Sequence, residues 1–193
     1  MVKEINKKEK IYEIAAKVFG ERGYDGASLD EIALRSKVAK GTIFYYFKNK
    51  EELFLSLIER GLSRLTEEIV VIAKNADSKD KLGELIECHF VFFKKYRNVG
   101  MMILNQMGYL KNRWNKRLNE VKDFYVESVK GIIAVEKKRN NIAGDLEAEG
   151  IIVSIFSLLA MMGLDWSVFS LQISKEKMNR TIKEIIFRGV KGM

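Results

Sequence analysis

Apolar residues recur at helical spacing along almost the whole chain, which is 193 residues long and contains no proline. A stripe at positions i, i+3, i+4 and i+7 predicts an amphipathic α-helix, and the alternation of period two that strands require is scarce. Proline is the strongest helix breaker, so its absence favours helices throughout. The sequence predicts an all-α protein of about nine helices, with a length that suits one unit or two small, closely packed domains.

The chain carries a formal net charge of +8 and has a sequence pI near 9.4. A polyanion such as nucleic acid is a reasonable partner for such a charge, although a merely soluble basic protein has the same balance. Hydrophobic residues make up 47% of the chain, which supplies enough apolar material for a core without disulfides.

Cys88 is the single cysteine, so it has no intramolecular disulfide partner. This agrees with a reducing compartment, and we expect a small packing residue rather than a redox sensor. Residues 1–10 are charged and lack the apolar core of a signal peptide. The longest apolar run, 151–164, is shorter than the roughly 20 residues that a membrane-spanning helix needs. We therefore expect a cytoplasmic protein with no membrane segment.

Two short helices joined by a tight turn are predicted near the N-terminus. A first helix over 7–22 precedes them, and Gly23 stands where a left-handed helix stop is expected. Ser28, with a glutamate three residues later, forms a capping box that starts a helix over 28–36, and a third helix is predicted over 40–47. Two short helices in this arrangement suit a helix-turn-helix.

The third predicted helix has an apolar inner face and a polar outer face. Ile43 and Phe47 are four residues apart and face the core. The outer side carries groups that suit phosphate oxygens and base edges, together with a glycine that permits close approach: Lys40, Gly41, Thr42, Tyr45 and Tyr46. Short helix pairs are common and aromatic residues at helical spacing often belong to a core, so the pattern alone leaves DNA binding and simple packing both open.

Residues 11–33 and 38–53 resemble the N-terminal signature of the tetracycline-repressor (TetR) family of transcriptional regulators. The first helix, the glycine–aromatic turn at 23–24, the capped second helix, and the runs GTIFYYF and KNKEEL occur in order and at family spacing within about the first 58 residues. The resemblance implies a helix-turn-helix DNA-binding domain over 1–49 and a C-terminal ligand-sensing and dimerisation domain over 50–193.

The resemblance also implies roles for individual residues. Ser28, Tyr46 and Lys50 would contact phosphates, and the residues facing bases or backbone in the major groove would be Lys40, Gly41, Thr42 and Tyr45. Two positions depart from the family. Phe44 replaces the usual tyrosine and loses a phenolic contact, and Ala39 replaces a common serine or threonine and loses a helix cap worth about 1 kcal/mol.

Helical periodicity continues through the C-terminal part of the chain, with Asn49 capping a long fourth helix. The later helices are expected from about 78, over 98–107, 111–139 and 145–164, and from about 174. The helix over 145–164 is apolar nearly all round, so it must be covered on nearly all sides, and a second subunit is the plausible cover on one of them. The predicted interface of a homodimer comprises Ile151, Ile155, Leu158, Met162, Met178, Ile182 and Ile185.

Family resemblance further implies a small-molecule effector bound among the C-terminal helices. Candidate pocket residues are His89, Phe90, Phe93, Met101, Met107, Trp114, Tyr125, Phe156 and Trp166. Each of them also suits an ordinary core, and their mix of aromatic and methionine side chains favours a lipophilic or aromatic ligand. His89 is a satisfied core histidine, a hydrogen-bond partner of the ligand or a metal ligand, and no second histidine or cysteine lies at ligand spacing. We expect neither a metal nor a cofactor.

Catalysis has no support in the sequence, which lacks a P-loop, a dinucleotide-binding glycine pattern and a zinc-ligand cluster. Cys88 and His89 are neighbours and point about 100° apart on a helix, so they do not form a ready dyad. The prediction is a sequence-specific regulator, a repressor released from a palindromic operator by a small molecule. Two alternatives stay open: an architectural DNA-binding protein without a ligand, and a regulator that responds to a protein partner through an exposed apolar patch.

Overall fold

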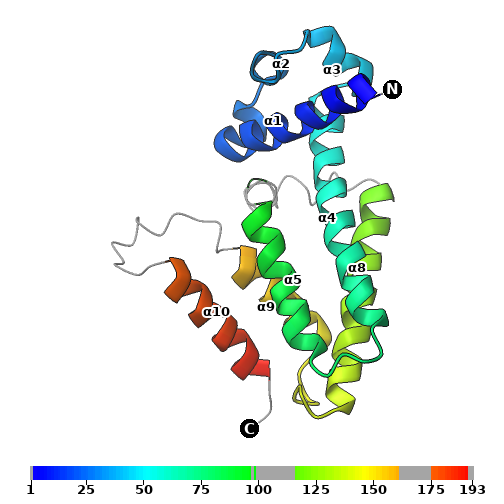
Figure 1. Ribbon diagram of the computed structural model, residues 1–193, viewed down its shortest axis with the longest axis vertical. Helices are drawn as coiled ribbons and strands as arrows, with labels where there is room; N and C mark the ends of the chain where they lie inside the picture. The colour runs from blue at the N-terminus through cyan, green and yellow to red at the C-terminus, as the bar shows by residue number, and fades with distance from the viewer. Residues whose placement is uncertain (1, 97, 99–115, 161–174, 191–193) are drawn as a thin grey trace. The chain divides into compact units, whose positions relative to one another are not determined.

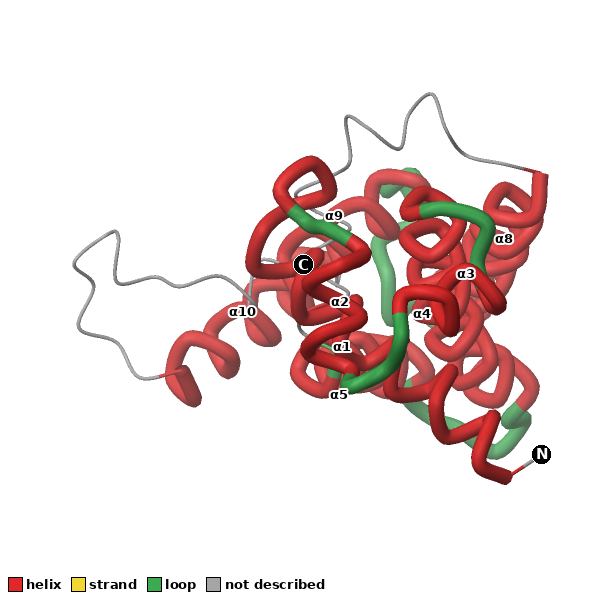
Figure 2. The backbone as a smooth tube through the Cα atoms, turned by 90° about the horizontal axis from the view of Figure 1, so that it is seen from above, coloured by secondary structure: helices red, strands yellow, loops and turns green. Residues whose placement is uncertain are grey.

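The computed structural model describes residues 2–96, 98, 116–160 and 175–190 (Figure 1). These residues form eight α-helices and contain no strand (Figure 2). The predicted all-α class is therefore confirmed. The expected helix over 98–107 lies outside the described residues apart from Asn98. None of the described helices is long and apolar enough to span a bilayer.

The described residues divide into two compact units. The first comprises the chain up to Gly61 together with 96, 98 and 116–119, and the second comprises 62–95 and the described residues from Glu120 onward. The division by contacts thus falls inside a helix, α4 (Lys50–Lys74). The assignment of domains to 1–49 and 50–193 stays a prediction.

The first unit contains α1 (Val2–Gly26), α2 (Leu29–Ser36), α3 (Lys40–Tyr46) and the beginning of α4. Each helix contributes its apolar face to one core, which includes the fully buried side chains of Ile11, Phe19, Ile32, Ile43, Leu53 and Phe54. Aromatic rings connect the helices, since the centroids of Phe19 and Phe54 are 5.1 Å apart. Burial of these apolar faces holds the short helices α2 and α3, which are too short to be stable alone.

Local capping signals set the helix starts of the first unit. The Ser28 hydroxyl accepts a hydrogen bond from the backbone N–H of Glu31 at 3.1 Å, as the predicted cap requires. The Glu31 carboxylate pairs with Arg35 at 2.6 Å and with Arg22 at 3.4 Å. Gly23 has a φ of 68° and interrupts α1, which begins earlier and continues further than the predicted 7–22.

The second unit contains the rest of α4, α5 (Lys81–Lys95), α8 (Lys116–Lys138) from Glu120 onward, α9 (Ala148–Ala160) and α10 (Lys175–Val190). The helices α5, α9 and α10 contact one another. Its core is aliphatic and aromatic, and includes Leu65, Ile69, Leu82, Leu85, Phe93, Ile132 and Ile155. The predicted helix over 145–164 is described as far as Ala160, and residues 161–164 lie outside the described residues.

Candidate nucleic-acid interface

The turn between α2 and α3 is closed by backbone hydrogen bonds around Lys37. Lys37 adopts the left-handed conformation, with φ 56° and ψ 43°, which is uncommon for a residue other than glycine. The N–H groups of Lys37 and Val38 donate to the carbonyls of Leu34 and Ala33, each at 3.1 Å. These bonds satisfy the last carbonyls of α2 and direct the chain into α3.

The helix α3 begins without a side-chain cap. Ala39 occupies the N-cap position and makes no side-chain hydrogen bond there, as its replacement of serine or threonine predicts. The helix is held instead by its inner face, because Ile43 is fully buried and Phe47 is nearly so. Packing against α2 thus compensates for the missing cap.

The opposite face of α3 is open. The side chain of Tyr45 is 74% exposed and that of Phe44 is 49% exposed. A Cβ added at Gly41 would meet no atom within 4 Å, so packing within the described residues does not require a glycine there. A bare backbone beside an exposed tyrosine leaves room for a second molecule to approach closely.

Two lysines of the predicted interface have intramolecular partners. The Lys40 ammonium forms an ion pair with Asp30 at 2.8 Å, in which both side chains are at least half exposed. Such a pair contributes little to stability, so Lys40 can exchange it for a phosphate at small cost. The Lys50 ammonium donates to the carbonyls of Tyr24 at 2.8 Å and Ala27 at 3.0 Å. It therefore fastens the end of α1 and the α1–α2 connection to the start of α4, and its contact with phosphate stays a prediction.

Three further residues belong to the predicted DNA contacts: Ser28, Thr42 and Tyr46. The Ser28 oxygen accepts the capping bond, and its hydroxyl hydrogen is suited to donate to a phosphate. Thr42 and Tyr46 are half-buried on the flank of α3, and the ring centroids of Tyr45 and Tyr46 are 4.9 Å apart. The structure thus places the predicted contact residues on α3 and on the two helix starts beside it, α2 and α4.

In the second unit, His89 is completely buried and both ring nitrogens are hydrogen-bonded. Nδ1 lies 2.8 Å from the carbonyl oxygen of Leu85, which only accepts, so Nδ1 carries the proton. Nε2 accordingly accepts a hydrogen bond from the Tyr125 hydroxyl at 2.8 Å. Burial lowers the pKa of His89 to about 4, against a smaller opposing effect of the bond to Leu85. His89 has the contacts of a satisfied core histidine, one of the three alternatives left by the sequence.

Aromatic side chains surround this pair. The ring centroids of Phe93 and Phe156 are 5.3 Å apart, and those of Tyr125 and Phe156 are 6.4 Å apart. The predicted pocket residues His89, Phe93, Tyr125 and Phe156 are thus brought together from α5, α8 and α9, whereas Phe90 is half-buried on α5. The other four candidates lie outside the described residues: Met101, Met107, Trp114 and Trp166.

The side chains of Cys88 and His89 have different partners. Its sulfur lies 3.7 Å from a carboxylate oxygen of Glu68, whereas His89 bonds to Tyr125. Burial, with the nearby Glu68 carboxylate, raises the pKa of Cys88 to about 12. The thiol is therefore protonated at neutral pH, and a reactive thiolate is absent.

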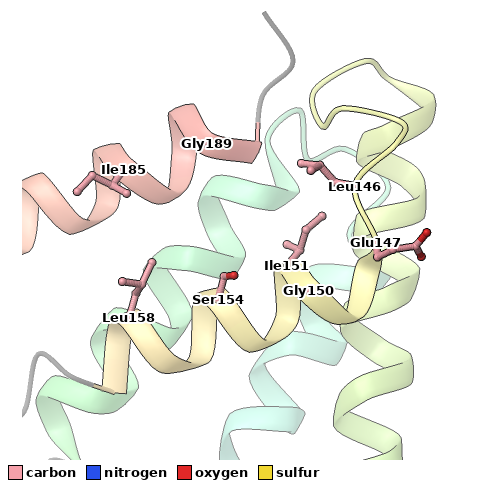
Figure 3. Close-up of a pocket in the computed structure, with 8 residues that line it drawn as sticks. All are labelled: Leu146, Glu147, Gly150, Ile151, Ser154, Leu158, Ile185 and Gly189. Atoms are coloured by element: carbon pink, nitrogen blue, oxygen red, sulfur yellow. The ribbon is translucent and has the colours of Figure 1, made fainter.

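An open groove of about 390 Å³ lies between α9 and α10 (Figure 3). Its lining is mainly apolar and includes small residues, which leave the space unfilled: Leu146, Glu147, Gly150, Ile151, Ser154, Leu158, Ile185 and Gly189. Leu158 is 36% exposed and Ile185 is 56% exposed. Apolar side chains in this position leave a surface that a further chain can cover.

The predicted dimer residues differ in their exposure and in how far the structure describes them. Leu158 and Ile185 are exposed at the groove, Ile151 borders it with little exposure, and Ile155 is buried within its own unit. Met162 lies outside the described residues. Met178 and Ile182 belong to α10, but their side chains are also outside the description.

A capped helix, a tight turn and a second helix with an exposed polar and aromatic face define a helix-turn-helix protein that binds DNA. Residues 11–57 match the family model described as bacterial regulatory proteins, tetR family. Over these residues the chain has the DNA-binding domain that is typical of the TetR family, which confirms the predicted resemblance and the predicted DNA-binding class.

Similar proteins extend the likeness beyond the N-terminal unit. The chain is 24% identical to the fatty acid metabolism regulator protein of Bacillus subtilis over 93% of each chain. It is similar to the solved structure of FadR from Bacillus subtilis in complex with stearoyl-CoA, with 25% identity, a TM-score of 0.68 and coverage of 94% of this chain and 98% of that one. The FadR structure from Bacillus halodurans shares the fold, with 22% identity, a TM-score of 0.72 and 94% coverage of both chains.

Proposed function

We propose that this protein is a cytoplasmic, homodimeric repressor that binds a two-fold symmetric operator through α3 and is released by a long-chain fatty acyl-CoA. The observation that carries the DNA-binding part is the outward face of α3, where exposed Tyr45 lies beside the open backbone of Gly41. No catalytic step is part of the proposal.

DNA recognition follows from the chemistry of this face. Tyr45 and Thr42 offer hydroxyls to base edges or phosphates, Lys40 offers a positive charge, and the Phe44 ring suits thymine methyl groups. Two copies of α3 in a homodimer would read half-sites about one helical turn, roughly 34–36 Å, apart. The net charge of +8 favours association with the phosphate backbone.

The choice of effector rests on two supports. One is the likeness over nearly the whole chain to a fatty acid metabolism regulator and to a FadR structure that holds stearoyl-CoA. The other is the character of the second unit, whose core is largely aliphatic and aromatic around the buried pair of His89 and Tyr125. An acyl chain suits apolar walls of this kind.

Release requires that the effector bind more tightly to the form that does not fit the operator. A dimer must place both copies of α3 in successive major grooves at once, so a modest change in their separation reduces affinity. By reciprocity, operator DNA would then weaken binding of the effector by the same factor.

The first test is a selection of duplexes from a random-sequence library with purified protein, followed by fluorescence anisotropy on the enriched duplex. We expect an enriched palindrome, bound at least tenfold more weakly by Tyr45→Ala. The matched control is Phe124→Ala, because Phe124 is another exposed aromatic residue, on α8. Absence of any enriched sequence would contradict specific regulation.

The second test adds stearoyl-CoA, free coenzyme A or stearate to the protein–duplex complex. We expect stearoyl-CoA to dissociate the complex at micromolar concentration and free coenzyme A to have no effect. Specific DNA binding that none of the three changes would contradict the acyl-CoA assignment and leave the DNA-binding assignment intact.

A further inference from the structure

A lysine of α1, outside the predicted contact set, lies beside the C-terminal end of α3. The Nζ atom of Lys8 is 5.8 Å from the ring centroids of Tyr12, Tyr46 and Phe47. Tyr46 is the last residue of α3 and is one of the predicted phosphate contacts. Lys8, at the beginning of α1, thus brings a positive charge to the end of α3.

Packing fixes this part of α1 against α3. The rings of Tyr12 and Phe47 meet edge to face, with centroids 5.3 Å apart. The Arg60 guanidinium, from α4, lies 4.8 Å from the centroid of the Tyr12 ring on the same segment. Lys8 is therefore carried by a helix turn that contacts both α3 and α4, and little reorganisation is needed to place its ammonium.

The charge of Lys8 is not neutralised within the described part of the chain, where no carboxylate lies within ion-pair distance of its ammonium. The adjacent carboxylate, Glu9, is bound by Arg60, with a distance of 2.7 Å between Nη1 and Oε1. The Lys8 ammonium lies near three aromatic rings, which orient a cation without cancelling its charge.

We infer that Lys8 is a further DNA-backbone contact, which holds a phosphate beside the end of α3. The ammonium supplies a strong, charge-assisted hydrogen bond to that phosphate. Such a contact carries no sequence information, and it positions α3 in the groove. The inference rests on the proposed binding of DNA by α3.

The experiment measures the dependence of DNA affinity on salt for the full-length protein and the variants Lys8→Ala and Lys8→Arg. The probes are the enriched duplex and a random-sequence duplex of equal length. Lys10→Ala is the control, since Lys10 is an exposed lysine about 200° from Lys8 around the same helix. Thermal melting monitored by circular dichroism verifies that each variant is folded.

Each lost phosphate contact reduces the slope of log K against log salt by about 0.9. We expect Lys8→Ala to lose about 0.9 per protomer on both duplexes, and Lys8→Arg and Lys10→Ala to retain the wild-type slope. A wild-type slope for Lys8→Ala, or an equal loss for Lys10→Ala, would overturn the inference while the binding of DNA stands. Failure of the wild-type protein to bind either duplex would overturn both.

Discussion

At the scale of single residues, the Ser36 hydroxyl is a buried polar group without a hydrogen bond in the described part of the chain. Its side chain is fully buried at the end of α2, and its hydroxyl has no hydrogen-bond partner within the described residues. A buried, unsatisfied hydroxyl is destabilising, so Ser36→Ala should raise the free energy of unfolding by about 1 kcal/mol. Urea unfolding at neutral pH measures the change.

Ser56→Ala is the matched control for this prediction. The Ser56 hydroxyl is partly buried and donates to the carbonyl of Leu53 at 2.8 Å, so its removal should bring no gain in stability. An equal gain from both substitutions would show that alanine's helix propensity, rather than the unsatisfied hydroxyl, is responsible.

His89 makes stability depend on pH. Its folded-state pKa is lowered from 6.5 to about 4, so between these values the unfolded chain binds a proton that the folded protein excludes. Its contribution is present above about pH 6.5 and is lost as the pH falls towards 4, by about 3 kcal/mol in total. Unfolding free energies of the wild type and His89→Phe, measured from pH 7 to pH 4, should differ by a pH-dependent amount. A constant difference over this range would contradict the prediction.

At the scale of helices, Gly41 is a position where a substitution should affect stability and DNA binding in opposite directions. Alanine has a higher helix propensity than glycine by about 1 kcal/mol, and a Cβ at Gly41 meets no described atom within 4 Å. Gly41→Ala should therefore stabilise the protein while it weakens operator binding. Gly131→Ala in α8 is the control, because that site is equally open, and it should stabilise without affecting DNA. Unchanged operator affinity in Gly41→Ala would exclude a close approach at this position.

The start of α4 gives a second prediction at this scale. Lys50 donates to one carbonyl at the end of α1 and to one in the α1–α2 connection, and its Nζ atom lies 4.4 Å from the centroid of the Tyr24 ring. Lys50→Met should lower the free energy of unfolding by about 2 kcal/mol, since hydrogen bonds from a charged donor are lost. Lys48→Met, at an exposed neighbour, should leave stability unchanged. Loss of DNA affinity without loss of stability in Lys50→Met would instead favour the phosphate role.

The helix boundaries could be predicted from the sequence because they depend on residues close together in the chain. Ser28 and Asn49 each accept a hydrogen bond from the backbone N–H three residues later, and Gly23 adopts the positive φ that interrupts α1. Contacts between distant segments have no such signal. Lys81 and Glu136 are charged, so their sequence predicts exposure, yet both are buried with partners supplied by folding.

The candidate site also combines residues that the sequence could predict with residues that it could not. Helical periodicity predicts which residues of α3 point outward, and the family motif assigns them to DNA. Lys8 and the carbonyl partners of Lys50 become apparent only after α1 packs beside α3 and α4, because their spacing in the sequence carries no periodic pattern. The ligand-site prediction is limited in another way, since four of its nine residues lie outside the described part of the chain.

At the scale of the whole molecule, the exposed apolar residues of α9 and α10 predict an association surface. Glutamate at Ile185 would place a charge at the groove, and a buried unpaired charge opposes assembly. Ile185→Glu should shift the protein from dimer to monomer in sedimentation velocity at micromolar concentration. Val71→Glu, on an exposed valine of α4, should leave the dimer intact. A dimer that persists in Ile185→Glu would place the interface elsewhere.

Cys88 is buried and its pKa is raised to about 12, so we expect it to react slowly with thiol-directed labels at neutral pH. A single exposed cysteine introduced on α3, for example by Lys40→Cys, would then be the one labelled position in each protomer. In a homodimer, two identical spin labels or fluorophores would report directly the distance between the two copies of α3. The natural sequence thus allows the spectroscopic measurement of that distance, with and without an effector, while its own cysteine remains in place.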